Sequence, residues 1–235
     1  MKFAIISAGE GSRLAQEGVK LPKPLVQLNG MAMIDRLIHI FAQNGAEEVV
    51  IIINNEVEQT KEYVAQLQKT SVVPLRVIVK TTPSSMHSFY ELSRYLKDDK
   101  FCLTTVDTIF REEEFAEYID KFKKSDKDGM MAVTDYIDDE KPLYISTDEN
   151  LGITGFHDTM PENCRFISGG IYCLTPKAID TLEGCMAQGM SRMRNFQRQL
   201  VADGLELEAY PFSKILDVDH AEDIKKAEDF LNSKE

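Results

Sequence analysis

The sequence predicts an α/β protein whose single domain is a doubly wound, mostly parallel sheet. Short apolar runs alternate with amphipathic segments in the order strand, helix, strand, helix through the first half. Residues 49–53 are five consecutive β-branched residues, a composition typical of a central parallel strand buried on both faces. With 235 residues, of which 43% are hydrophobic, the chain is long enough for one sizeable core.

Each element of the first half has its own signal. The apolar run 3–6 is bounded by Ser7-Ala8-Gly9 and predicts the first buried strand. A loop containing glycines and prolines follows it up to residue 24. Apolar residues then recur at helical spacing over 34–41, and Asn44-Gly45 marks the end of that helix. The further expected strands are 49–53, 75–79 and 101–105, and the further expected helices are 57–68, 86–96 and 112–123.

The second half is less regular and predicts shorter strands. The expected strands are 130–133, 144–145, 152–156, 168–174 and 205–210, and the expected helices are 175–184, 191–203 and 221–231. No repeat, low-complexity segment or linker divides the chain. We therefore expect one domain over residues 1–235, in which the second half elaborates the sheet that the first half begins.

Charge and cysteine usage exclude several classes of protein. The net charge of −12 argues against binding of duplex nucleic acid, which needs a dense basic face. The four cysteines form no C-x-x-C pair, which argues against a zinc or redox motif. The first apolar run is too short for a signal peptide, and no run approaches the roughly 20 apolar residues of a membrane span. We expect a cytoplasmic protein without nucleic-acid or membrane partners.

The loop after the first strand is the most informative segment. It contains Ala8-Gly9-x-Gly11-x-Arg13-Leu14 and then Leu21-Pro22-Lys23-Pro24-Leu25. Ligands of open α/β sheets bind beyond the carboxyl ends of the strands, where this loop lies. Its glycines allow the backbone to approach phosphate oxygens, Arg13 offers a bidentate fork and Lys23 a point charge. Leu14 rules out a Rossmann fingerprint, and the absence of Gly-Lys-Ser/Thr rules out a Walker loop.

This loop resembles the signature of the sugar-phosphate nucleotidyltransferases, a family that includes hexose-1-phosphate nucleotidylyltransferases and CTP:phosphocholine cytidylyltransferases. The resemblance continues along the chain in the family's order. Asp107 stands where the family places a metal-binding Asp, residues 168–172 resemble the strand along the acceptor pocket, and residues 217–223 resemble its closing acidic segment. These matches extend from residue 7 to residue 223 and are more specific together than any one of them.

The resemblance implies a Rossmann-like fold of the nucleotide-diphospho-sugar transferase type. It implies that residues 1–125 bind the nucleotide, and that residues 126–235 bind the acceptor and close the metal site. The implied reaction transfers NMP from an NTP to a phosphorylated small acceptor, most simply a sugar 1-phosphate, and releases pyrophosphate. In the implied roles, Arg13 binds the triphosphate, Lys23 binds the α-phosphate and the attacking phosphate, Ser7, Ala8 and Gly9 contact the nucleobase, and Gly11 and Ser12 contact phosphates.

The resemblance also implies that Asp107 and the pair Asp217 and Asp219 hold Mg²⁺ against the α-phosphate. Mg²⁺ favours one or two carboxylates together with substrate phosphates. In an extended segment Asp217 and Asp219 point the same way, so both could face the metal. We favour Asp219 for direct ligation, with Asp217 as a second ligand or a supporting group. A competing interpretation is that Asp219 caps the final helix.

The sequence departs from the family at the base and acceptor contacts. The usual Gly-Thr-Ala type segment is replaced by residues 82–88, where Thr82, Ser84 and Ser85 could donate the equivalent hydrogen bonds. No lysine stands near residues 156–158, where many sugar-specific members have one. A CTP:phosphocholine-type cytidylyltransferase, a glycosyltransferase and a non-catalytic nucleotide-sugar-binding regulatory protein therefore stay open as alternatives. A homo-oligomer is possible.

Overall fold

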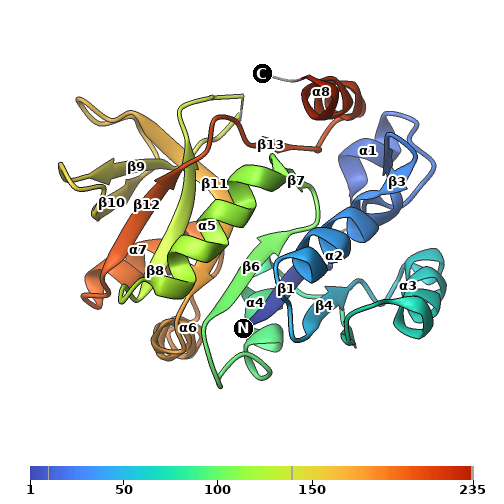
Figure 1. Cartoon of the computed structure of the whole chain (residues 1–235), viewed down its shortest axis with the longest axis horizontal. Coiled ribbons are helices and arrows are strands. Elements are labelled where there is room, and N and C mark those ends of the chain that lie inside the picture. Colours follow the sequence, from blue (N-terminus) through green and yellow to red (C-terminus); the bar gives the residue numbers. More distant parts are fainter. Residues whose placement is uncertain (10, 139, 234–235) are drawn as a thin grey trace.

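The computed structural model describes residues 1–9, 11–138 and 140–233, and its central feature is one large twisted sheet (Figure 1). Within these ranges nine strands run in the order β10-β9-β11-β6-β1-β4-β5, with β8 beside β11 and β12 beside β8. The strands are β1 (Lys2–Ser7), β4 (Val49–Ile53), β5 (Leu75–Val79), β6 (Phe101–Thr105), β8 (Gly129–Thr134), β9 (Tyr144–Thr147), β10 (Ile153–His157), β11 (Phe166–Leu174) and β12 (Leu207–Pro211). Strands from both halves of the chain thus share one sheet.

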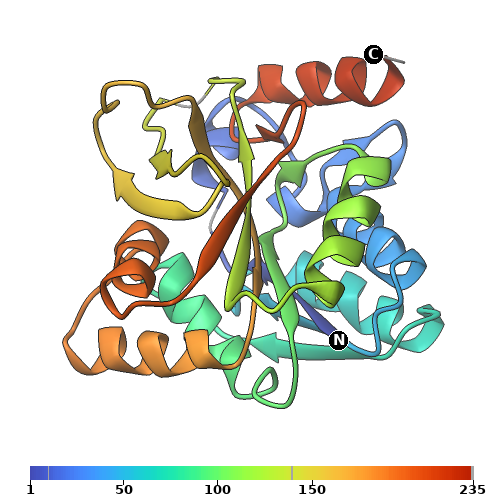
Figure 2. The ribbon, with the colours of Figure 1, turned by 60° about the vertical axis from the view of Figure 1, so that its left-hand side comes forward.

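Helices cover both faces of this sheet, which gives three layers (Figures 1 and 2). They are α2 (Met33–Gln43), α3 (Glu58–Thr70), α4 (Ser85–Ser93), α5 (Glu112–Lys124), α6 (Lys177–Ala187) and α7 (Met193–Ala202). A further helix, α8 (Ala221–Asn232), lies beyond one end of the strands (Figure 2). Buried residues of α2, α3 and α5 belong to the core on one face, and those of α4, α6 and α7 to the core on the other. None of the helices in the described ranges is both long and apolar enough to cross a lipid bilayer.

The parallel half of the sheet confirms the predicted doubly wound class. β1 pairs in parallel with β4 on one side and with β6 on the other, and β4 pairs in parallel with β5. The chain therefore moves outward from β1 to β5 and then returns to the opposite side of β1 with β6. The strand order reverses between β1 and β6, and ligands of such sheets bind beyond the carboxyl ends at this point.

Strand β1 shows why this sequence forms a buried strand. Phe3 and Ile5 enter the core beneath α2 and α5, whereas Ala4 and Ile6 enter the core beneath α4. Phe3 packs against Phe41 of α2 with 4.7 Å between the ring centroids. A strand buried on both faces needs apolar residues at every position, which explains the uninterrupted apolar run.

The second half adds a mixed extension to the parallel strands. β11 pairs antiparallel with β6, β8 and β9, while β12 pairs in parallel with β8. The register between β11 and β8 shifts after Ser168, and Gly170 has a φ of 74°, so glycine is needed there to form the irregularity. β11 is nine residues long, longer than predicted, because it has partners on both sides.

Several short elements were not predicted. The loop after β1 contains the helix α1 (Ser12–Gln16) and the 3-10 turn η1 (Lys23–Leu25), followed by the hairpin of β2 (Gln27–Leu28) and β3 (Met31–Ala32). A second small ribbon pairs β7 (Thr108–Ile109) antiparallel with β13 (Leu216–Asp217). Two-residue strands lack a detectable alternation, so only the tertiary structure reveals them.

Candidate active site

Two adjoining clefts share Arg13 and Asp219, and the first of them lies beyond the carboxyl ends of β1 and β6. The first cleft has a volume of about 450 Å³ and lies between the loop after β1, the segment before α4 and the end of β6. It is lined by Ser7, Ala8, Gly9, Gly11, Ser12, Arg13, Lys23, Thr81, Thr82, Ser84, Ser85, Ser88, Asp107 and Asp219, together with neighbouring apolar residues. All residues for which nucleotide, phosphate or metal contact was predicted line this cleft, with the exception of Asp217.

The side chains of Lys23, Asp107 and Asp219 meet at the floor of the first cleft. The Lys23 ammonium contacts the Asp107 carboxylate, and it donates to Asp219 Oδ1 at 2.6 Å. Both carboxylates contact the same nitrogen. Because each contact is no longer than a hydrogen bond of about 3 Å, the nearest oxygens of the two carboxylates lie within about 6 Å of each other. Lys23 and Asp107 are only 14% and 15% exposed, whereas Asp219 is 35% exposed. The site is therefore a largely desolvated ion triad that opens to solvent on the Asp219 side.

Burial and charge act on Lys23 in opposite directions. Burial would lower the pKa of Lys23, but the adjacent carboxylates of Asp107 and Asp219 outweigh it, so the pKa lies above its ordinary value. Lys23 is thus held as an ammonium at neutral pH. Its backbone starts the turn η1 between Pro22 and Pro24, whose rings fix φ, so the main chain that carries the ammonium is rigid.

The ribbon of β7 and β13 brings the two acidic segments together. Thr108, directly after Asp107, pairs with Asp217, and the N–H of Val218 donates to the carbonyl of Asp107 at 3.1 Å. This backbone bond places Asp219 opposite Asp107 although 112 positions separate them in the sequence. The carboxylate of Asp223 accepts hydrogen bonds from the backbone N–H groups of Asp219 and His220, at 3.2 and 2.8 Å. Asp223, rather than Asp219, is therefore the carboxylate that holds the start of α8.

Arg13 reaches the same site from α1. Its guanidinium lies 3.2 Å from Asp219 Oδ2 and its side chain is 53% exposed, so it stands at the mouth of the cleft.

The residue after α1, Glu17, connects this helix to the start of α8. Its carboxylate accepts a hydrogen bond from the N–H of Ala221 at 2.6 Å and lies 2.6 Å from Nδ1 of His220. The Ala221 and His220 hydrogen bonds lower the pKa of Glu17, and the Glu17 hydrogen bond raises the pKa of His220. The contact between Glu17 and His220 was not identified from the sequence, because their separation of 203 positions gives no local signal.

The glycine loop is shaped by one positive φ and one buried amide. Gly11 has a φ of 61°, and a Cβ there would lie 3.0 Å from the Cβ of Lys23, so a larger residue would press on the triad. Asn54, directly after β4, is buried and donates from its side chain to the carbonyl of Ala8 at 3.2 Å. Thr81 donates to Asn54 Oδ1 at 2.9 Å. Sequence reasoning missed Asn54, although a polar residue directly after a run of β-branched residues was a usable signal.

The hydroxyl groups predicted to replace the family's base-contacting segment line the first cleft. Thr82 Oγ1 lies 2.6 Å from the hydroxyl of Ser88, and Ser84 Oγ lies 2.8 Å from Nδ1 of His87. Ser85 begins α4. Local hydrogen bonds thus orient two of these hydroxyl groups within the cleft.

The second cleft has a volume of about 460 Å³ and shares Arg13 and Asp219 with the first. Asp217 lies in this second cleft, together with Ser168 and Gly169 of β11. Along its walls the carboxylates outnumber Lys and Arg among the described residues. The carboxylates belong to Asp138, Glu140, Asp217, Asp219, Glu222 and Asp223, and the cations are Arg13, Lys141 and Lys226. The ammonium of Lys226 lies within 4 Å of three of these carboxylates, those of Asp138, Glu222 and Asp223.

The chain is similar in sequence to proteins of known function. The family model for nucleotidyl transferases matches residues 2–234. A mannose-1-phosphate guanyltransferase 2 from Candida glabrata is 28% identical over 191 residues, which cover 78% of this chain and 52% of that protein. A glucose-1-phosphate cytidylyltransferase from Salmonella typhi is 24% identical over 204 residues, which cover 78% of each protein. The chain thus spans about half the length of the guanyltransferases that it matches.

A solved structure extends the likeness to the whole chain. The inositol-1-phosphate CTP transferase from T. maritima superimposes with a TM-score of 0.80 and 19% sequence identity, covering 100% of this chain and 97% of that one. At this identity the likeness shows a shared fold. Taken with the match of the family model over residues 2–234, it leads to one conclusion: the chain belongs to the sugar-phosphate nucleotidyltransferase family.

Proposed function

We propose that this protein transfers a nucleoside monophosphate from an NTP to a phosphorylated small acceptor, with a sugar 1-phosphate as the acceptor class, and releases pyrophosphate. The observation that carries the proposal is the first cleft, where a glycine loop, two cations and two carboxylates meet within one polar volume. The names of the relatives, which act on mannose 1-phosphate and glucose 1-phosphate, support the acceptor class.

In the proposed reaction an oxygen of the acceptor phosphate forms a bond to the α-phosphorus of the NTP. The bond between that phosphorus and the oxygen bridging to the β-phosphate breaks, and pyrophosphate leaves with the electron pair. Two anions must approach each other, so the task of the protein is positioning and charge neutralisation. A phosphate acceptor is already deprotonated at neutral pH, so the reaction needs no general base.

Lys23 and Arg13 are the cations available for this task. Lys23 stands on the floor of the cleft, and its ammonium suits the α-phosphate and the attacking phosphate. Arg13 stands at the mouth, and its planar fork suits the triphosphate and the departing pyrophosphate. Both residues are held now by carboxylates of the same cleft, so phosphates that enter would exchange one set of anionic partners for another.

We propose Mg²⁺ as the metal, held by Asp107 and Asp219. Both carboxylates already face one cation, Lys23, and their hard oxygen atoms fit a hard divalent ion. No group of three or more His, Cys, Asp or Glu side chains in the described ranges has a metal-binding arrangement, so phosphate and water oxygens would complete the shell. When bound, the ion would neutralise charge on the α-phosphate. Asp217, which lines the second cleft, would support the segment or contact the acceptor.

A second candidate is a CTP:phosphocholine-type cytidylyltransferase. The excess of carboxylates along the second cleft favours it, since that cleft would hold the part of the acceptor beyond its phosphate. Carboxylates attract a positively charged group such as choline, and they also accept hydrogen bonds from sugar hydroxyls. The acidic lining is the observation in favour of a cationic acceptor, whereas the names of the relatives favour a sugar 1-phosphate, and a direct comparison of substrates distinguishes the two classes.

The test is pyrophosphate release from each of the four NTPs with a panel of sugar 1-phosphates and phosphocholine. We expect turnover with at least one pair and loss of turnover when the divalent ion is chelated. A preference for phosphocholine would select the second candidate. Silence across the panel, together with binding of a nucleotide sugar, would contradict catalysis and favour a regulatory protein.

A further inference from the structure

The triad of Lys23, Asp107 and Asp219 contains a cation where two carboxylates converge. Lys23 has three N–H donors, and the two described acidic partners are the carboxylates that we propose as metal ligands. The rigid turn η1 fixes the backbone of Lys23, but the side chain reaches the floor of the cleft on four flexible methylene groups. The position of the ammonium can therefore change without movement of the loop.

Electrostatics make the ammonium and a divalent ion alternatives. Two carboxylates this close to each other, of which Asp107 is largely buried, repel each other, so a cation between them is strongly favourable. A divalent ion at the same carboxylates would repel an ammonium in direct contact with them. Arg13 cannot replace Lys23 in this role, because it contacts Asp219 from the mouth of the cleft and is half exposed.

We propose that Lys23 occupies the metal site of the nucleotide-free protein, and that it leaves Asp107 and Asp219 to a divalent ion when nucleotide phosphates enter the cleft. This inference rests on the proposed function for the identity of the incoming anion. Lys23 thus has a second task besides binding phosphate: it keeps the two carboxylates together and delays metal binding until a nucleotide is present. By linkage, the nucleotide and the ion then strengthen each other's binding.

The experiment measures Mn²⁺ binding to the nucleotide-free protein by electron paramagnetic resonance of free Mn²⁺. Wild type should bind Mn²⁺ weakly. Lys23→Met should bind at least about tenfold more tightly, because the competing ammonium is gone while both carboxylates stay. Lys23→Gln serves as a second variant should the Met variant fail to fold, which thermal unfolding reports. Lys23→Arg retains a cation and should stay within about twofold of wild type.

Two control variants distinguish a local effect at Asp107 and Asp219 from the effect of removing any nearby positive charge. Lys226→Met removes a cation from the neighbouring acidic cleft, where Lys226 contacts Glu222 and Asp223, and it should change Mn²⁺ affinity by less than about twofold. The double variant Lys23→Met with Asp107→Asn should lose the gain. A gain that survives in the double variant, or a gain of equal size in Lys226→Met, would contradict exchange at this pair.

The proposal fails if Lys23→Met and Lys23→Gln, both folded, bind Mn²⁺ no more tightly than wild type. This outcome is independent of the turnover panel, since it needs no substrate. A wild-type protein that turns over while these variants gain no affinity would keep its proposed function and lose the exchange. A silent panel with a tenfold gain would retain competition at the carboxylates and remove the proposed function.

Discussion

At the scale of residues, the site concentrates opposite charges that the sequence keeps far apart. Lys23, Asp107 and Asp219 come from three segments, yet their charged groups form one partly buried cluster. A buried ion pair adds little net stability, since desolvation offsets the attraction. We therefore interpret the cluster as functional, and a neutral substitution of one carboxylate, which leaves Lys23 the other carboxylate as a partner, should affect turnover more than folding.

The first prediction concerns Asp107→Asn. Asparagine keeps the size and one oxygen of the side chain but removes the charge that faces Lys23. We expect turnover to fall by a factor of at least about 10². Thermal unfolding should stay within about 4 °C of wild type, because Lys23 keeps Asp219 as a partner. Pyrophosphate release and a melting curve measure the two effects, and a fully active variant would remove Asp107 from the metal site.

The second prediction concerns Gly11→Ala. A left-handed φ of 61° costs an alanine about 1–2 kcal/mol, and its Cβ would press on Lys23 at 3.0 Å. We expect the melting temperature to drop by about 2–8 °C and turnover to fall as well. Gly18→Ala, at a φ of 91° with open space around its Cβ, is the matched control for the backbone cost alone. Equal activity of the two variants would argue against a shaping role of Gly11.

At the scale of elements, two small tertiary contacts assemble the site. The ribbon of β7 and β13 aligns the acidic segments, and Glu17 joins α1 to the start of α8, which lies beside α1 in Figure 1. Both contacts connect the first half of the chain to its last 25 residues. The closing segment therefore forms part of the first cleft, although most residues that line this cleft lie in the first half of the sequence.

The third prediction tests the contact between α1 and α8. Glu17→Ala removes the acceptor of the Ala221 N–H and the partner of His220, so α1 and its Arg13 should lose their anchor. We expect nucleotide affinity to fall by about fivefold, the effect of one lost hydrogen bond. Titration of the nucleotide measures it, with Glu62→Ala on the exposed side of α3 as control. Unchanged affinity in Glu17→Ala would show that Arg13 needs no support from α8.

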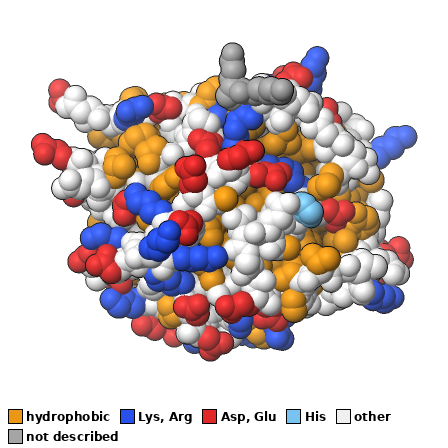
Figure 3. Space-filling model, in the orientation of Figure 1, with side chains coloured by type: hydrophobic (Ala, Val, Ile, Leu, Met, Phe, Trp, Pro, Cys, Tyr) orange, Lys and Arg blue, Asp and Glu red, His pale blue; other side chains and the backbone are white. Residues whose placement is uncertain are grey.

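At the scale of the whole molecule, the net charge of −12 is distributed without a continuous acidic field on the face drawn in Figure 3. Lys and Arg side chains lie among Asp and Glu side chains across this face. A locally cationic loop can then bind an anion in an acidic protein, because screening limits the reach of distant charges to about 10 Å. The overall acidity bears on solubility and partners more than on the site.

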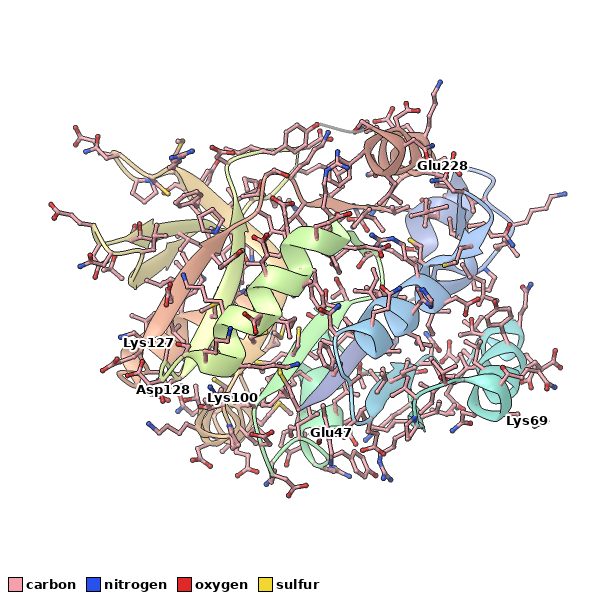
Figure 4. All side chains as sticks on the ribbon, in the orientation of Figure 1. Glu47, Lys69, Lys100, Lys127, Asp128 and Glu228 are labelled. Atoms are coloured by element: carbon pink, nitrogen blue, oxygen red, sulfur yellow. The ribbon has the colours of Figure 1, made fainter. Side chains whose placement is uncertain are left out.

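The fourth prediction concerns stability against pH and uses Asp128, which Figure 4 labels at the end of the molecule opposite α8 and its Glu228. Burial would raise the pKa of Asp128, but its ion pair with Lys177 at 2.8 Å and its hydrogen bond from the N–H of Glu206 outweigh burial, and the pKa is lowered. A lowered carboxyl pKa stabilises the fold above the unfolded value of about 3.9, and the contribution is lost as pH falls through the folded value.

Asp128→Asn should therefore lower the melting temperature at pH 7 by about 2–4 °C, and the difference from wild type should shrink below about pH 4. Turnover should be unchanged, since Asp128 lies outside both clefts. Melting curves between pH 3 and pH 7 measure the effect. A difference that is the same at every pH would assign the loss to packing instead of charge.

The sequence by itself determined the class of fold, the order of the main elements and the loop that indicates the family. Periodicity and composition act within a few residues, so the β-branched run 49–53 and the apolar spacing of 34–41 predict their elements directly. The same holds for Gly11, Arg13 and Lys23, because the chemistry of the loop is contiguous in the chain. The sequence also predicted a list of residues that line the first cleft, but it did not predict how they are arranged in space.

Only the tertiary structure decided how these groups meet. The two-residue strands β7 and β13 place Asp219 on Lys23 and Asp107, and they leave Asp217 in the neighbouring cleft. Asn54 and Glu17 act across distances in the sequence that no local pattern encodes. Ion pairs and backbone bonds between distant segments depend on the packing of the whole sheet, and that packing fixes the geometry of the site.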